Sequence, residues 1–262
     1  MPRVVEDGVL YTKSYSFGVK EVYVIDKAPS LKDLPSDKLA RETNEKKNLI
    51  DSVNRARKTV FDVAVSNTWD WFVTLTFAVE RTNYADKYDL IRNELHQIKR
   101  YNKDFKFIFI AEAHKKVEKN GLHAIHFHGL ISGLPDEELC NRAVNKLGVI
   151  YNWRRMNEYG FNSMSAVRNQ EACGAYLQKY MTKSLLKPSF HKSMYVLSRG
   201  LYRPLRHKYR IKGYLLPEVK RMLRALSCDI FVTWVGVSYT LSNCNLSDNE
   251  IFRGYGLIEE MG

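Results

Sequence analysis

Two histidines, His126 and His128, are separated by one residue within the apolar run 124–130, AIHFHGL. The run predicts a short β-strand, and side chains along a strand alternate between its two faces. His126 and His128 therefore project from one face, while Phe127 points into the core on the other. Imidazoles are common metal ligands, so this pair predicts half of a metal site. Most His-x-His pairs hold no metal, and ordinary surface or core histidines are the alternative interpretation.

About fifty residues downstream, residues 176–183 read YLQKYMTK. If this stretch is a helix, one stripe of its surface carries two phenols and two ammonium groups, at i, i+3, i+4 and i+7. These groups belong to Tyr176, Lys179, Tyr180 and Lys183. Nucleophilic tyrosines beside lysines and a divalent metal indicate phosphoryl transfer to tyrosine. The same spacing also fits amphipathic packing without chemistry.

A third segment, residues 72–77 (FVTLTF), is rich in β-branched and aromatic residues and predicts a strand upstream of the histidines. The order FVTLTF, HFH, YLQKYMTK resembles the three motifs of the HUH endonucleases. It is most similar to the rolling-circle replication initiators of small single-stranded DNA phages and related plasmids. The resemblance covers residues 55–204. Because two tyrosines four residues apart follow the histidines, it points to the two-tyrosine initiators; conjugative relaxases place the tyrosine first.

The cofactor expected is Mg²⁺ or Mn²⁺. Two imidazoles alone suit such a hard cation poorly, because it favours oxygen ligands, so a carboxylate is expected as well. The resemblance gives this role to Glu112, which follows the predicted strand 105–111. The polar segment 115–121 should turn that strand onto the histidine strand. Without the histidines, Glu112 would be interpreted as an exposed strand-end glutamate; His114 and His123 are weaker ligand candidates.

The implied reaction is the attack of a tyrosine hydroxyl on a metal-polarised phosphodiester, giving a 5′-phosphotyrosine and a free 3′-hydroxyl. A free phenol has a pKa of about 10, so activation needs positive charge, which the metal and Lys179 or Lys183 would supply. The 3′-hydroxyl can prime a DNA polymerase, and the second tyrosine can release the replicated circle. The spacing does not say which tyrosine attacks first. Because the sequence has no Gly-x-x-x-x-Gly-Lys-Ser/Thr loop, a separate host helicase is expected to unwind the DNA.

The formal charge of +12 and the pI near 9.4 suit a polyanionic partner. Within residues 195–214, tyrosines alternate with cations, so the segment is expected to contact the single-stranded DNA origin. Cations can follow phosphates, and each base stacked on an aromatic ring contributes about 1 to 3 kcal/mol. A basic connector packed on the catalytic core is an equally good interpretation. The candidate contacts are Arg199, Tyr202, Arg203, Arg206, Lys208 and Arg210.

The sequence predicts an N-terminal extension (1–35), a catalytic domain with a leading helix (36–190) and a basic C-terminal region (191–262). The four cysteines show neither disulfide nor zinc spacing, which favours reduced thiols in a cytoplasmic protein. No secretory signal segment or membrane-spanning run is evident, so no membrane association is expected.

The predicted elements form an α+β fold, an antiparallel sheet with packed helices, which is also the RRM-like layout that the resemblance implies. Helices are expected over 37–66, 86–101, 135–147 and 215–226, beside the tyrosine helix. Strands are expected over 161–167 and within 228–241, where 230–237 suits one buried strand. Residues 243–262 are expected to form a polar, turn-rich tail.

Three functions fit these patterns. The favoured one is a replication initiator that nicks and rejoins one origin strand. A transposase or other mobile-element recombinase would use the same site on a different substrate, but the paired tyrosines and the basic C-terminal region favour the initiator. A non-catalytic DNA-binding protein would bind DNA without metal and would never form a covalent adduct.

Overall fold

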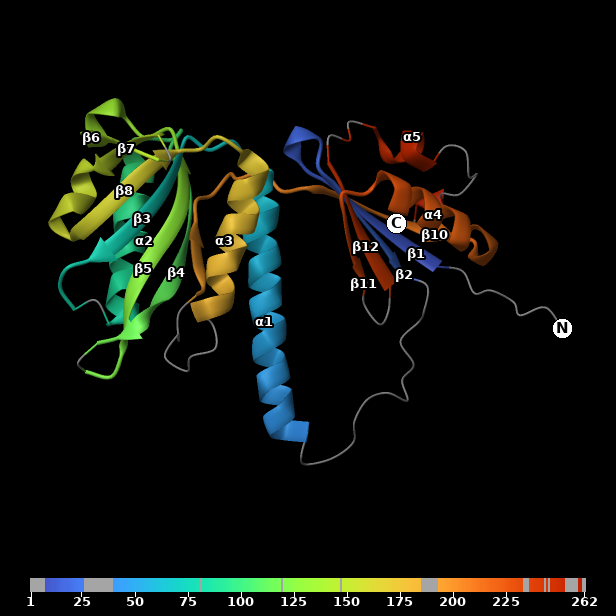
Figure 1. Cartoon of the computed structure of the whole chain (residues 1–262), viewed down its shortest axis with the longest axis horizontal. Helices are drawn as coiled ribbons and strands as arrows, with labels where there is room; N and C mark the ends of the chain where they lie inside the picture. Colours follow the sequence, from blue (N-terminus) through green and yellow to red (C-terminus); the bar gives the residue numbers. More distant parts are fainter. Residues whose placement is uncertain are drawn as a thin grey trace. The chain divides into compact units, whose positions relative to one another are not determined.

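The structure is a computed structural model of the 262-residue chain. It describes residues 8–25, 40–80, 82–118, 120–146, 148–184, 193–232, 236–242, 244, 246–252 and 259–260. The chain divides into two compact units, which we call unit 1 (Met1–Arg41 with Arg203–Gly262) and unit 2 (Glu42–Tyr202). Each unit contains one antiparallel sheet with helices (Figure 1), so the predicted α+β fold is confirmed.

Unit 2 is built on a seven-stranded sheet, counted over the described residues. The strand with the first motif and the strand with the histidines are neighbours near the centre of this sheet. Between them in the sequence come a helix and the first strand of a hairpin, and the second strand of that hairpin carries the histidines and pairs with the first-motif strand. In spatial order the strands are β6 (Leu139–Asn145), β7 (Gly148–Trp153), β8 (Gly160–Ala166), β3 (Trp71–Phe77), β5 (His123–Ser132), β4 (Lys106–Val117) and β9 (Tyr195–Leu197).

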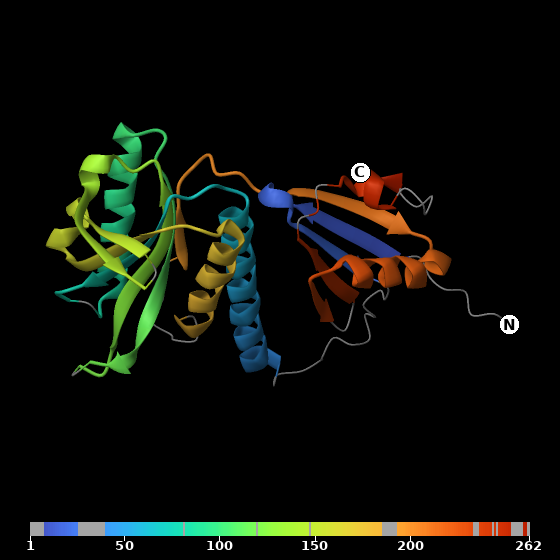
Figure 2. The ribbon, with the colours of Figure 1, turned by 45° about the horizontal axis from the view of Figure 1, so that its top comes forward.

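Helices cover both faces of this sheet (Figures 1 and 2). Helix α2 (Tyr84–Tyr101) packs on one face through an apolar stripe that includes Ile91 and Leu95, which are fully buried. Helices α1 (Ala40–Val65) and α3 (Gln170–Ser184) pack on the opposite face, around Leu130 of β5. Alternation along the strands divides the side chains between two cores, so the sheet presents one face to α2 and the other to α3.

Local sequence explains where α2 begins and ends. The Asn83 side chain accepts a hydrogen bond from the backbone of Asp86, which satisfies one of the unpaired amides of the first turn. Asp86 lies in that first turn, and Lys99 and Arg100 lie in the last turn, as the helix dipole favours. The predicted helix at 86–101 is thereby confirmed, as is the strand at 161–167, which corresponds to β8.

The helix predicted over residues 135–147 is wrong. The three acidic residues form only a short turn, η3 (Asp136–Glu138), and the chain continues as the β6–β7 hairpin, which joins the edge of the sheet. Gly148, at the start of β7, has a φ of +99°, a conformation that glycine tolerates without strain. Pairing with the sheet therefore outweighs the helical preference of the acidic turn. A second short turn, η4 (Arg154–Glu158), connects β7 to β8.

Unit 1 contains a six-stranded sheet within the described residues, and both ends of the chain contribute to it. N-terminal residues 8–25 are therefore part of the same sheet as the C-terminal region, which the sequence did not predict. In spatial order the strands are β11 (Asp229–Val232), β12 (Gly236–Leu241), β2 (Lys20–Ile25), β1 (Gly8–Ser14), β10 (Leu205–Ile211) and β13 (Glu259–Glu260). The remaining elements are η1 (Ser16–Gly18), η5 (Gly213–Leu215), α4 (Leu216–Leu226) and α5 (Asp248–Phe252).

The C-terminal residues differ from the predicted turn-rich tail. Helix α5 begins with a reciprocal cap, in which the Ser247 amide donates to the Glu250 carboxylate and the Glu250 amide donates to the Ser247 hydroxyl. Ile251 and Phe252 then insert into the core of unit 1. The single strand predicted over 230–237 is also wrong, because this region contains parts of β11 and β12, which pair antiparallel. The helix predicted over 215–226 is confirmed as α4.

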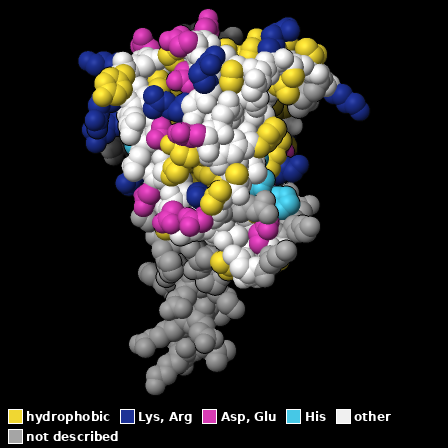
Figure 3. Space-filling view, turned by 90° about the vertical axis from the view of Figure 1, so that its left-hand side faces the viewer, with side chains coloured by type: hydrophobic (Ala, Val, Ile, Leu, Met, Phe, Trp, Pro, Cys, Tyr) yellow, Lys and Arg dark blue, Asp and Glu magenta, His cyan; other side chains and the backbone are white. Residues whose placement is uncertain are grey.

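Surface charge is mixed on the side of unit 2 that carries β6 and β7. Figure 3 shows acidic and basic side chains interspersed there, without a large patch of one sign. The net positive charge of the chain therefore does not indicate that this face binds nucleic acid.

The four cysteines are free thiols. Among the described residues, no helix is both long and apolar enough to cross a membrane.

Candidate active site

Strand register brings the first two motifs onto one face of the unit 2 sheet. On β3, Thr74 lies directly opposite His128 and Thr76 opposite His126. On the other side of β5, Glu112 of β4 lies opposite His126. Directly opposed residues in antiparallel strands share a face. The two histidines and the predicted carboxylate therefore lie side by side, as the sequence predicted.

Hydrogen bonds hold both imidazoles in place. His128 Nε2 lies 2.9 Å from Glu112 Oε2, and its Nδ1 lies 3.2 Å from Thr74 Oγ1. His126 Nδ1 lies 3.2 Å from Thr76 Oγ1 in the same way. A hydroxyl can donate or accept, so each threonine can fix its imidazole in either tautomer. These threonines were not among the predicted site residues, although their Thr-x-Thr alternation matches the His-x-His spacing on the neighbouring strand.

The tyrosine helix lies over this site. The Tyr180 ring stacks on the His128 ring, with centroids 4.0 Å apart and planes at 20°. The Tyr180 hydroxyl donates a hydrogen bond to the Tyr176 hydroxyl. Tyr176 packs edge-on against Phe72 and leaves 43% of its surface exposed. Both phenols predicted as nucleophiles are thus grouped beside the histidine–glutamate pair.

Tyr180 resists ionisation in this arrangement. Burial is the main reason that the pKa of its phenol lies above the ordinary value. The hydrogen bond to Tyr176 and the charges of Tyr176 and Glu112 raise that pKa further. A phenol in these surroundings stays protonated unless additional positive charge stabilises the phenolate.

Close packing against α1 sets the position of α3. A Cβ atom at Gly174 would lie 2.7 Å from Val65 Cγ2 and 3.1 Å from Phe61, so only glycine lets the two helices approach this closely. Leu177 and Met181 are buried in the core between α3 and the sheet. The helix face that carries Tyr176 and Tyr180 therefore has a fixed orientation over β5.

The donor types at the site suit a divalent cation. Two imidazoles and a carboxylate are ligands for Mn²⁺. Because the threonines hold Nδ1, Nε2 is the atom of each imidazole that would bind a cation, and at His128 the cation would replace the present contact between Nε2 and Glu112. Over the described residues, no group of three or more histidine, cysteine, aspartate or glutamate side chains is already arranged around one point. His114 stacks on His126 with centroids 5.0 Å apart, and His123 Nδ1 lies 2.6 Å from the His114 carbonyl oxygen.

The predicted lysines are only partly placed. Lys179 is exposed on α3, next to Tyr180 in the sequence. Lys183 belongs to α3, but its side chain lies outside the described part of the structure.

The predicted DNA-contact segment, residues 195–214, is divided between the two units. Arg199 follows β9, and the backbone amide of the preceding residue, Ser198, donates to the Phe107 carbonyl of β4. Glu112 is five residues beyond Phe107 on β4, which is about 17 Å at the rise of a strand. Asn67 bonds both backbone groups of Tyr202 at 3.0 Å, while 70% of the tyrosine surface is exposed. Arg203 is exposed, and Arg206, Lys208 and Arg210 lie on β10 of unit 1.

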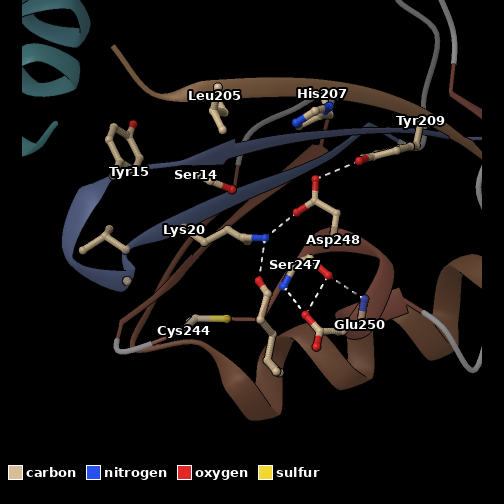
Figure 4. Close-up of a pocket in the computed structure, with 13 residues that line it drawn as sticks. Ser14, Tyr15, Lys20, Leu205, His207, Tyr209, Cys244, Ser247, Asp248 and Glu250 are labelled. Atoms are coloured by element: carbon tan, nitrogen blue, oxygen red, sulfur yellow. Dashed lines mark hydrogen bonds and ion pairs between the residues drawn. The ribbon is translucent and has the colours of Figure 1, made fainter. Parts of the chain in front are cut away.

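A hollow of about 500 Å³ lies in unit 1, between the sheet and α5 (Figure 4). Lys20 and Asp248 form a buried ion pair there, and Tyr209 Oη also donates to Asp248 at 2.9 Å. Burial acts to raise the pKa of the Asp248 carboxyl, but hydrogen bonds from Lys20, Thr12 and Tyr209 together hold that pKa below its ordinary value. The described groups thus join α5 to β1, β2 and β10, and none of them was a predicted site residue.

Comparison with known proteins finds a similarity to replication-associated proteins over the part of the chain that carries the three motifs. A family model described as "Replication-associated protein ORF2/G2P" matches residues 70–185. No curated protein and no solved structure matches the chain. The matched span runs from β3 through α3 and includes the threonines, Glu112, both histidines and both tyrosines. Over this span the chain is similar to the replication-associated family, which supports a role in the initiation of replication.

Proposed function

We propose that the protein is a two-tyrosine HUH replication initiator that nicks and rejoins single-stranded DNA at a replication origin. The observation that carries the proposal is the grouping of the Tyr176 and Tyr180 hydroxyls over His128 and its partner Glu112. Phosphodiester transesterification requires a nucleophile beside a group that polarises the phosphate, and tyrosines beside a prospective metal site meet both requirements. The match to the replication-associated family supports the same assignment.

The proposed reaction exchanges one ester for another. A tyrosine hydroxyl attacks the scissile phosphorus, loses its proton and forms the O–P bond of a 5′-phosphotyrosine. The bond from phosphorus to the 3′-oxygen breaks, and that oxygen leaves as a free 3′-hydroxyl. Because one phosphodiester replaces another, the reverse attack rejoins the DNA ends. The second tyrosine, whose hydroxyl is hydrogen-bonded to the first, can accept the strand in a later transfer.

Mg²⁺ or Mn²⁺, held by His126, His128 and Glu112, would supply positive charge to polarise the phosphate. The chain's own residues do the positioning. Thr74 and Thr76 orient the imidazoles, and the α1–α3 contact places both phenols above them. Lys179 and Lys183 are proposed to stabilise negative charge as the phenol ionises.

The partners that we propose are a single-stranded origin, a host helicase and a DNA polymerase. Arg199 and Tyr202, at the end of unit 2, are proposed to contact DNA together with Arg203, which follows them in the sequence and is the first residue of the C-terminal part of unit 1. The clamped backbone of Tyr202 supports this role, because an exposed ring on a fixed backbone loses little entropy on stacking with a base.

The test is cleavage of single-stranded oligonucleotides that tile the parent replicon, with Mn²⁺ or with a chelator. We expect metal-dependent cleavage at one site. Replacing both histidines (His126→Ala, His128→Ala) should abolish cleavage and leave most of the charge-driven DNA binding, since neither histidine is a phosphate contact in this account. Unchanged metal-dependent cleavage by the folded double variant would overturn the site assignment.

A further inference from the structure

The unit 1 sheet has one face covered by helices and one face that the described helices leave open. Helices α4 and α5 share a core with alternate residues of the strands, among them Leu10, Val22 and Tyr209. Side chains in between, such as Tyr11, Tyr23 and Lys208, must project from the other side of the sheet. We call this second side the open face.

The centre of the open face carries an aromatic pair beside a cation. Tyr11 of β1 lies directly opposite Tyr23 of β2 and, on its other side, opposite Lys208 of β10. Three side chains therefore form one row across three adjacent strands, at neighbour distances of about 5 Å. The Lys208 Nζ lies 5.7 Å from the centroid of the Tyr11 ring, which is within reach of a cation–π interaction. Tyr11 leaves 37% of its surface exposed.

Positive charge follows one edge of this aromatic row. Arg206, Lys208 and Arg210 alternate along β10, so their side chains share the open face at intervals of about 7 Å. Arg206 and Arg210 are exposed. The carboxylate of Glu21, on the same face, is offset by Lys13, whose Nζ lies 3.7 Å from it. The described part of this face thus combines stacking surface with a line of cations.

We propose that the open face of unit 1 binds single-stranded DNA, with bases stacked on Tyr11 and Tyr23 and phosphates along Arg206, Lys208 and Arg210. The inference rests on the proposed function and deepens it, because it gives the nicked strand a second contact surface outside unit 2. It also brings the N-terminal strands, for which the sequence indicated no function, into DNA binding.

The chemistry favours an unpaired strand over a duplex. A tyrosine ring on a flat sheet can stack only on a base whose face is free, and every base has such a face, so the contact tolerates any sequence. Cations beside the rings neutralise phosphates and make binding sensitive to salt. A duplex would meet the cations but would leave the aromatic pair without a stacking partner.

The first test compares Tyr11→Leu/Tyr23→Leu with Tyr101→Leu, a control that removes an exposed tyrosine at the end of α2. Fluorescence anisotropy would measure affinity for a labelled oligonucleotide and for the same strand with abasic sites. One stacked base is worth roughly 5- to 150-fold in affinity. We expect the double variant to bind the normal strand at least about tenfold more weakly than the control, and to lose the preference for it over the abasic strand.

A second test examines the same surface through its cations, so the proposal can still be rejected if the tyrosine variant does not fold. Arg206→Ala/Lys208→Ala removes two cations from the open face, and Arg221→Ala/Arg224→Ala removes two exposed cations from α4. The first pair should flatten the plot of log affinity against log salt by about 1.4, or 0.7 per phosphate contact on a single strand. The α4 pair should leave the slope close to that of the wild type.

These outcomes separate the open face from the proposed chemistry. Weaker binding by the open-face variants, without any covalent product from the wild type, would keep the DNA surface and reject the nicking reaction. A covalent product, together with open-face variants that bind like their controls, would reject the surface and keep the reaction. Equal affinity of the wild type for normal and abasic strands, or a preference for duplex, would also overturn the stacking role.

Discussion

At the scale of single residues, two threonine hydroxyls decide how the histidines can act. Thr74 and Thr76 each lie 3.2 Å from the Nδ1 atom of the opposed imidazole. Groups that orient metal-binding histidines typically change metal affinity or activity by about 10- to 100-fold when they are removed. The pair should therefore matter for metal use although neither hydroxyl would touch the metal or the DNA.

Replacing both threonines by valine (Thr74→Val, Thr76→Val) keeps their shape and removes the hydrogen bonds. We expect the Mn²⁺ concentration for half-maximal cleavage to rise by about 10- to 100-fold, because the imidazoles lose the hydrogen bonds that hold their orientation. Cleavage measured over a range of Mn²⁺ concentrations tests this. Binding of Mn²⁺ to the protein would be followed separately by the electron paramagnetic resonance signal of unbound Mn²⁺. Ser163→Ala is the control, since Ser163 lies opposite Thr74 on β8 and is assigned no histidine contact. An unchanged Mn²⁺ requirement would remove the orienting role.

At the scale of elements, the close packing of α3 against α1 determines where the tyrosines lie. Gly174→Val should force the helices apart, because even a Cβ atom would lie 2.7 Å from Val65 Cγ2. Overpacking of this kind costs about 1 to 3 kcal/mol of the free energy of unfolding. We also expect slower cleavage, since Tyr176 and Tyr180 move with the helix.

Urea denaturation and single-turnover cleavage would measure these two effects. Ala175→Val is the matched control: it adds a β-branched residue at the next position of α3, where the side chain is exposed. Equal stability and equal cleavage rates for Gly174→Val and Ala175→Val would show that the close approach of α1 and α3 does not place the tyrosines.

The ion pair below α5 gives unit 1 a defined response to acid. The pKa of Asp248 is lower in the folded protein than in the unfolded chain. Its contribution to stability is therefore complete above about pH 4, the ordinary carboxyl pKa, and is lost as the pH falls through the lowered folded value. Asp248→Asn should cost about 3 to 5 kcal/mol at pH 7, because the buried Lys20 ammonium loses its partner.

Urea unfolding of Asp248→Asn between pH 3 and pH 7 measures this, with the exposed Asp229→Asn as the control. The stability difference between the wild type and Asp248→Asn should shrink as the pH falls below about 4. A difference that stays constant over this range would show that the charge of Asp248 does not stabilise the fold.

The strands that carry the chemistry could be predicted from the sequence, because alternation and β-branched residues are local signals. His126 and His128 share the face that this alternation predicted, and the tyrosines lie on the predicted helix. Glu112, which was assigned by resemblance and expected at the end of a strand, lies inside β4 and opposite His126. Residues 135–147 could not be assigned correctly in the same way. Their acidic turn has helical character, but pairing of β6 with β7 and β8, which is a tertiary effect, decides their structure.

Two features of unit 1 were missed for different reasons. Helix α5 did have a local signal, because Ser247 and Glu250 have the spacing of a capping box before Ile251 and Phe252. The pairing of β1 with β10 had none, since those strands are almost two hundred residues apart and nothing in either segment specifies its partner. Long-range strand pairing of this kind depends on the whole fold.

At the scale of the whole molecule, we propose different tasks for the two units. Unit 2 holds the prospective metal ligands and both nucleophiles, and unit 1 offers an open face suited to an unpaired strand. The net charge of +12 of the whole chain supports binding to a polyanion and predicts that DNA affinity falls steeply with salt. The central claim remains the chemistry of unit 2: a tyrosine of α3 becomes covalently joined to DNA.

The most direct measurement is therefore the mapping of a covalent adduct. The protein would be incubated with single-stranded oligonucleotides from the parent replicon, with Mn²⁺ or with chelator, then digested and analysed by mass spectrometry. We predict a nucleotide-modified peptide that appears only with metal, carries the modification on Tyr176 or Tyr180, and is absent from the Tyr176→Phe/Tyr180→Phe variant. An adduct on another residue, or none despite tight DNA binding by the folded protein, would contradict this account.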